Sequence, residues 1–116
     1  MKKVIIGVIL ALVASEALSA HYYRNRTIVG AGVYYSGQES VLFISLDGDL
    51  SEMASCAGNA RLAINSSAPH YKEIVSIALT AYASGQSTVD VYVDEQCTYY
   101  SGAENILGIK IGSMAF

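Results

Sequence analysis

Alternating apolar and polar positions predict three strands between residues 27 and 65. Residues 27–35 are rich in β-branched and aromatic side chains and end at a Ser-Gly pair, which is typical of a strand followed by a turn. Residues 41–46 form a second apolar run, and a hairpin is the simplest way to pair the two runs. Residues 60–65 predict a third strand, with Leu62 and Ile64 on one face and Arg61 on the other.

Helical periodicity follows these strands. The segment Ser66-Ser67-Ala68-Pro69 predicts a helix that begins near Pro69, because hydroxyl side chains cap free amides and proline is tolerated in the first turn. Gly85 is predicted to end the helix in the left-handed conformation. The helix would turn one apolar stripe inward: Tyr71, Ile74, Val75, Ala78, Leu79 and Tyr82.

Two more strands complete the pattern. Residues 88–94 alternate, with valines inward and Asp90 and Tyr92 outward, and residues 106–112 alternate again, with Leu107, Ile109 and Ile111 on one face. The order β-β-β-α-β-β predicts a mainly β domain with one α-helix. A five-stranded OB-fold-like β-barrel has this order, and an α+β sandwich is the alternative.

The N-terminus predicts export. Lys2 and Lys3 precede an apolar stretch over residues 4–14, and small residues follow up to Ala20. The stretch is too short to span a bilayer, so residues 1–20 are predicted to be a signal peptide cleaved after Ala20, with Ala17 as the alternative. Residues 21–116 would then be a single periplasmic or secreted domain, with no membrane span in the mature protein.

The mature domain would be acidic. Loss of Lys2, Lys3 and Glu16 with the signal peptide leaves five basic and nine acidic residues, a net charge of −4. A protein that binds a phosphate backbone needs a basic patch. This balance therefore argues against nucleic acid as a partner.

The two cysteines, Cys56 and Cys97, predict a disulfide. An even pair in an exported chain is typically bridged, and the bridge would close a loop of 41 residues, the difference between the two positions. The alternatives are a metal site, which would need more cysteine or histidine ligands, and a reactive thiol.

The helix region resembles a known family. The stretch Ala68-Pro69-His70-Tyr71-Lys72-Glu73-Ile74, with the later Ser84-Gly85-Gln86-Ser87 and the pair Tyr22-Tyr23, resembles the B subunits of AB5 toxins of the subtilase cytotoxin and typhoid toxin type. It is also similar to small uncharacterised secreted proteins of gammaproteobacteria. The resemblance implies an OB-fold, a ring of five subunits with helices around a central pore, sugar binding on the outer face of the barrel, and an exported A-subunit-like partner.

Two features depart from the toxin pattern. A serine that follows the Tyr-Tyr pair in those subunits, and contacts the sialic acid carboxylate there, is Arg24 in this chain. Cys56 and Cys97 also do not fall where the toxin subunits place their cysteines. The resemblance therefore implies the fold more directly than it implies sialic acid as the ligand.

Tyrosines are the candidate ligand-binding residues. The chain has nine Tyr, no Trp and two Phe, and tyrosine offers an apolar face with a polar tip, which suits sugar or protein recognition. The alternative is that these side chains pack in the core or at edges. The candidates are Tyr22, Tyr23, Arg24, Tyr34 and Tyr99, with Tyr35 and Tyr100 nearby in the sequence.

The outer face of the predicted helix is small and only mildly polar. Glu73, Ile77, Thr80 and Ser84 are spaced so that they share one side, and we predict that this side is an interface between copies of the chain. The alternative is an ordinary surface helix.

The sequence offers little for catalysis. A Cys56 nucleophile with His70 as its base would require an unpaired cysteine. Asp47-Gly48-Asp49 resembles the start of a calcium loop, but the later ligands are missing, so a plain turn is expected. We predict no enzymatic activity, no metal and no cofactor. The first hypothesis is a glycan-binding, B-subunit-like ring, and the alternative is a periplasmic protein-interaction or inhibitor domain without a sugar ligand.

Overall fold

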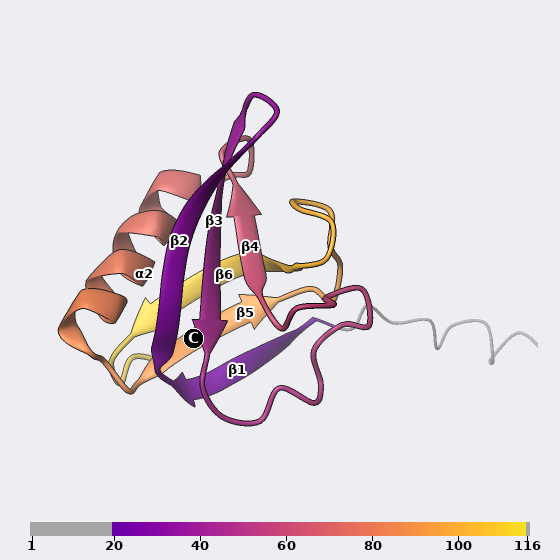
Figure 1. Ribbon diagram of the computed structural model, residues 1–116. Helices are drawn as coiled ribbons and strands as arrows, with labels where there is room; N and C mark the ends of the chain where they lie inside the picture. The colour runs from indigo at the N-terminus through magenta and orange to yellow at the C-terminus, as the bar shows by residue number, and fades with distance from the viewer. Residues whose placement is uncertain (1–19, 116) are drawn as a thin grey trace, which may run out of the picture.

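The computed structural model describes residues 20–115, which form six strands and one helix (Figure 1). The predicted signal peptide lies outside the described residues, apart from Ala20. No helix among the described residues is both long and apolar enough to cross a membrane. The elements are β1 (His21–Arg26), β2 (Ile28–Ser36), β3 (Glu39–Leu46), β4 (Leu62–Asn65), α2 (Tyr71–Ser84), β5 (Val89–Val93) and β6 (Glu104–Ile111).

The strands form one mixed sheet in the order β1-β5-β6-β4-β3-β2. The predicted hairpin of β2 and β3 is confirmed, and the one parallel pair joins β4 to β6. The two edge strands, β1 and β2, are consecutive in the sequence and meet at Thr27. The expectation of five strands closed into a barrel is therefore corrected to a six-stranded sheet whose two edges do not pair with each other.

The strand that the sequence did not predict is β1. Its six residues, HYYRNR, show no alternation of apolar and polar side chains, and only Tyr23 among them is buried. β1 is held as a strand by its hydrogen bonds to β5, a pairing that hydrophobic periodicity could not indicate.

Helix α2 lies against β2 and β6 (Figure 1). It begins two residues later than predicted, after His70, which adopts a left-handed conformation and makes no side-chain cap. Gly85 ends the helix in the left-handed conformation, as predicted, with φ of 67°. The hydroxyls of Ser66 and Ser67 instead donate to Glu39 and Asn65.

The inward face of α2 is rotated from the predicted one. Ile74, Ala78 and Ala81 are buried, whereas Leu79 and Tyr82, predicted to face inward, are 41% and 46% exposed. Apolar residues occur around most of this helix, so the sequence did not decide which of them would face the sheet. The alanines let the helix backbone approach the sheet closely.

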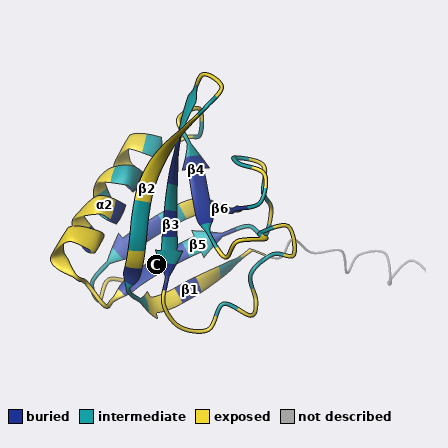
Figure 2. Cartoon of the chain, viewed as in Figure 1, coloured by how far each residue is buried: buried dark blue, intermediate teal, exposed yellow. Residues whose placement is uncertain are grey.

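The main core lies between α2 and the inner face of the sheet, and the central strands are the most deeply buried (Figure 2). The predicted inward side chains of Val89, Val91 and Val93 are fully buried. Asp90, predicted to point to solvent, is also buried, because β1 and β6 flank its strand. The main core also contains these strand residues: Leu42, Ile44, Leu46, Leu62, Ile64, Ile106 and Ile109.

A bulge in β6 changes which residues of that strand face the core. The register shifts between the pairs Tyr92–Gly108 and Val93–Ile106, which skips Leu107. Ile106 and Ile109 are therefore both buried and Leu107 is exposed, although the predicted alternation placed Leu107 and Ile109 on the same face.

Cys56 and Cys97 form a disulfide, as predicted, with their Cα atoms 6.1 Å apart. Cys56 lies in the long loop between β3 and β4, and Cys97 lies between β5 and β6. The bridge therefore joins two loops that hold few regular hydrogen bonds of their own.

We expect the double substitution Cys56→Ser/Cys97→Ser to lower the free energy of unfolding by about 4 kcal/mol, because the bridge restricts a 41-residue loop in the unfolded chain. Urea unfolding of the variant and of the oxidised wild type measures the difference. Wild type treated with a reductant is the matched control and should behave like the variant. Equal midpoints for the oxidised protein and the variant would show that the bridge contributes nothing.

Candidate functional site

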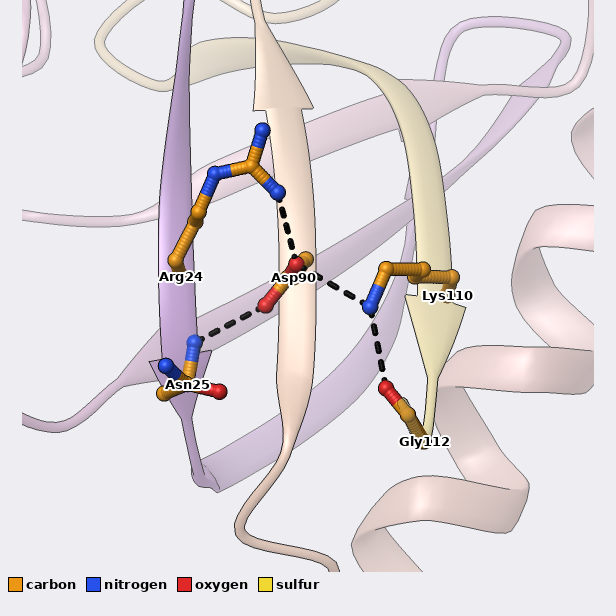
Figure 3. A network of polar contacts seen from close by, with 5 residues as sticks. All are labelled: Arg24, Asn25, Asp90, Lys110 and Gly112. Atoms are coloured by element: carbon orange, nitrogen blue, oxygen red, sulfur yellow. Dashed lines mark hydrogen bonds and ion pairs between the residues drawn. The ribbon is translucent and has the colours of Figure 1, made fainter. Parts of the chain in front are cut away.

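The chain bends sharply where β1 becomes β2, and Asp90 of β5 holds this bend (Figure 3). Asn25 adopts a left-handed conformation with φ of 55°, and the register between β1 and β5 shifts at this point. The backbone N–H of Asn25 donates to Oδ1 of Asp90 at 2.8 Å. This bond satisfies an amide that the shifted ladder leaves without a strand partner.

The other oxygen of Asp90 binds two cations. Nη1 of Arg24 lies 2.9 Å from Oδ2 and Nζ of Lys110 lies 3.1 Å from it, and Lys110 also donates to the carbonyl of Gly112 (Figure 3). The side chains of Asp90 and Lys110 are only 6% exposed. Burial alone would raise the pKa of Asp90, but the Asn25 amide and the two cations outweigh it and hold the pKa below its ordinary value of 3.8.

Arg24 forms a surface with two tyrosines. Its guanidinium carbon lies 4.1 Å from the centre of the Tyr22 ring, and the rings of Tyr22 and Tyr92 lie 4.7 Å apart. Arg24 is about half exposed and reaches Asp90 through Nη1. We call Tyr22, Arg24 and Tyr92 the β1–β5 surface. It presents aromatic faces and guanidinium N–H donors that are held in place by a buried carboxylate.

Tyr23 does not belong to this surface, although the sequence placed it with Tyr22. Successive side chains of a strand point to opposite faces, and Tyr23 is 2% exposed within the main core. Its hydroxyl donates to Oε1 of the buried Glu104 at 3.2 Å. Burial raises the pKa of both Tyr23 and Glu104. Tyr23 is therefore a core residue and contacts no external ligand.

The remaining predicted tyrosines lie on other parts of the fold. Tyr34 is exposed on β2 and contacts Phe43 and Tyr100. Tyr35 is exposed near the end of the same strand. Tyr99 packs against the main core, and burial raises its pKa. The predicted set is thus divided between two surfaces and the core.

Sequence reasoning missed Tyr92, Phe43 and Arg61 as surface partners. Signals existed for two of them, because Tyr92 was predicted to point outward from its strand and Arg61 was placed opposite Leu62 and Ile64. Nothing in the sequence indicated that Tyr92 would pair with Tyr22, because the two lie on strands far apart along the chain.

The predicted interface residues lie along the outer side of α2. The hydroxyls of Thr80 and Ser84 donate to the carbonyls of Ser76 and Thr80 within the helix. Ile77 is partly buried and packs against the main core. The exposed Leu79 and Tyr82 lie on the other flank of the helix, across the buried stripe of Ile74, Ala78 and Ala81.

The Asp47-Gly48-Asp49 turn braces the bend between β1 and β2. Asp47 accepts the Thr27 amide through Oδ1, and the Arg26 guanidinium donates to the carbonyls of Asp47 and Asp49. A side chain at Gly48, where φ is +83°, would come within 2.9 Å of that guanidinium. Within residues 20–115 no group of three or more His, Cys, Asp or Glu is placed to hold a metal ion.

No protein-family model matches this sequence, and no curated protein matches it. Solved structures do resemble the fold. A homopentamer of a Salmonella typhi PltB point mutant, with Neu5Ac-α2-3-Gal-β1-4-GlcNAc glycans, superposes with a TM-score of 0.62 at 17% identity, covering 81% of this chain and 86% of that one. The homopentamer of a second PltB point mutant superposes with a TM-score of 0.58 at 16% identity and the same coverage. PltB is the typhoid toxin B subunit, and the chain therefore has a toxin B-subunit-like fold.

We expect Asp90→Asn to destabilise the protein by about 2–3 kcal/mol at neutral pH, because Lys110 would keep a buried charge without its partner. The lowered pKa of Asp90 means that its stabilisation is present above pH 3.8 and lost as the pH falls through the lower folded-state pKa. Denaturant unfolding between pH 7 and pH 3 should show a smaller loss of stability for the variant than for wild type.

The double variant Asp90→Asn/Lys110→Met serves as the control, because it removes the buried lysine charge as well. It should recover part of the lost stability. A single Asp90→Asn variant as stable as wild type at pH 7 would contradict the structural role given to this carboxylate.

Proposed function

We propose that this protein is an exported glycan-binding module of the toxin B-subunit type that acts as a ring of identical subunits. The observation that carries the proposal is the likeness of its fold, over 81% of the chain, to a homopentamer in complex with a sialylated trisaccharide. The predicted signal peptide supports export to the periplasm or beyond, and β1 begins at His21, the residue that follows the predicted cleavage position. An exported A-subunit-like partner would complete such an assembly.

The β1–β5 surface is the proposed sugar contact. Sugars are recognised by aromatic rings that cover their C–H faces and by polar groups that bind their hydroxyls. Tyr22 and Tyr92 supply the rings, and Arg24 supplies the donors. Asp90 fixes Arg24 before a ligand arrives, which lowers the entropy lost on binding.

The ring is proposed to form through the outer side of α2, at Glu73, Ile77, Thr80 and Ser84. The small, mildly polar side chains on this side support the assignment, because close packing between copies of a helix needs such side chains. Assembly would also serve sugar binding, since weak single-site contacts gain strength when several act together.

A protein-interaction domain is the second candidate, and the edge strand β2 favours it. β2 ends the sheet and exposes Val29, Val33, Tyr34 and Tyr35. An apolar edge of this kind can pair with a strand of another protein.

For the ring, native mass spectrometry at tens of micromolar protein should show a pentamer, and Thr80→Arg should convert it to monomers. Thr80 is exposed and bonds only within its helix in the described structure, so the variant should keep the fold. Ile77→Lys is a less clean test because Ile77 also packs on the core. Gln86→Arg adds the same charge beyond the helix and should leave the pentamer intact. A monomeric wild type would refute the ring.

For the glycan, immobilised Neu5Ac-α2-3-Gal-β1-4-GlcNAc and its counterpart without Neu5Ac, within a wider array of glycans, are the probes. We expect Tyr22→Ala and Arg24→Gln each to weaken glycan binding by about ten-fold or more, through loss of ring contact and of charged donors. Tyr35→Ala removes a tyrosine that is more exposed than Tyr22 and lies on β2, and it should bind like wild type. Absence of binding to every glycan on the array would leave the protein-interaction alternative.

A further inference from the structure

A second surface lies on the outer face of β2, β3 and β4, away from the main core. Six residues line an open hollow of about 330 Å³: Gly32, Val33, Tyr34, Phe43, Arg61 and Tyr100. A Cβ atom at Gly32 would meet no heavy atom within 4 Å. The absence of a side chain at this position keeps the hollow open. We call it the Arg61 pocket.

The aromatic walls of the Arg61 pocket are held in place by contacts with one another. The rings of Phe43 and Tyr100 meet edge to face at 4.8 Å, and those of Tyr34 and Tyr100 do so at 5.9 Å. Behind them lies a small second core of Val41, Ala63 and Ala103, all buried. The shape of the pocket is therefore set by packed side chains before any ligand binds.

Arg61 gives the pocket its charge. Its guanidinium carbon lies 4.5 Å from the centre of the Phe43 ring, and Nε is buried with no hydrogen-bond partner among the described residues. Arg24 binds Asp90, and Arg26 binds two carbonyls. Within the described part of the chain, no carboxylate forms an ion pair with Arg61. The guanidinium therefore brings a positive charge to the pocket that no described side chain neutralises, and an anionic group on a ligand would neutralise it.

We propose that the Arg61 pocket binds a carboxylate that is attached to a ring. The carboxylate lies on the guanidinium of Arg61, where paired N–H donors match its two oxygens, and the ring rests against Tyr34 and Tyr100. The volume of the pocket is at the small end of ligand sites and suits one ring. This site is separate from the β1–β5 surface and does not depend on the proposed glycan function.

A ring-borne carboxylate has two sources, a sugar acid or a free aromatic acid. Glucuronate and benzoate are the probes for these sources, with methyl glucoside and benzyl alcohol as uncharged counterparts. Chemical-shift titration of the ¹⁵N-labelled protein follows residues around the pocket. We expect at least one acid to bind with a Kd below about 10 mM and its uncharged counterpart to bind at least about ten-fold more weakly.

The variants assign the binding to the pocket. Arg61→Gln should weaken acid binding by about ten-fold or more, and Arg61→Lys should lie between it and wild type, because lysine keeps the charge but loses the paired donors. Gly32→Val should block binding by filling the hollow while leaving the sheet intact. Lys72→Gln, which removes an exposed charge on α2 away from both surfaces, should bind the acid like wild type.

Several results would overturn the proposal. These are the absence of binding by both acids, equal binding of acids and uncharged counterparts, or loss of binding in Lys72→Gln but not in Arg61→Gln. If Arg61→Gln fails to fold, as judged by its amide spectrum, Gly32→Val and Arg61→Lys decide the question by the same criteria.

Discussion

The hydrogen bond from the Asn25 amide to Asp90 is the contact on which the arrangement of this sheet depends. One continuous segment, β1 and β2, supplies both edges of the sheet, and it can do so only if the chain turns away from β5 within a few residues. On the β5 side of the bend, Asp90 accepts the Asn25 amide. On the other side, Arg26 donates to the Asp47 carbonyl in the turn that contains Gly48. The same carboxylate neutralises the buried Lys110 and orients Arg24. Asp90 therefore both stabilises the bend and positions the exposed Arg24.

A second buried carboxylate, Glu104 at the start of β6, links that strand to β1 inside the core. It accepts the Tyr23 hydroxyl inside the core, and its own backbone amide donates to the carbonyl of Arg61. Because burial raises the pKa of Glu104, its charged form adds a cost at neutral pH that a neutral side chain would avoid. The nearby disulfide ties the two loops that lead into this region.

The two candidate surfaces use the same elements in different ways. In each, a guanidinium lies over an aromatic ring, at 4.1 Å for Arg24 on Tyr22 and 4.5 Å for Arg61 on Phe43. Arg24 is paired with a carboxylate of its own chain, which weakens its pull on an anion but fixes its position. Arg61 forms no ion pair within the described residues, so its charge is available to a ligand. A flat platform suits an extended ligand such as a glycan, whereas a small hollow suits a single ring.

The sequence by itself determined the helix and its Gly85 end, the β2–β3 hairpin, the inward valines of β5 and the disulfide. Each of these depends on local periodicity, on turn residues or on the presence of only two cysteines. It also singled out Tyr22, Arg24 and Tyr34, which are exposed, but together with Tyr23, which is buried, and Tyr99, which is partly buried. Only the tertiary structure decided that β1 exists, that Asp90 is buried and that Leu79 and Tyr82 face outward. Each of these depends on which strands become neighbours. That choice is made by packing between residues far apart along the chain, such as Tyr22 with Tyr92 and Asn25 with Asp90, and no local pattern records it.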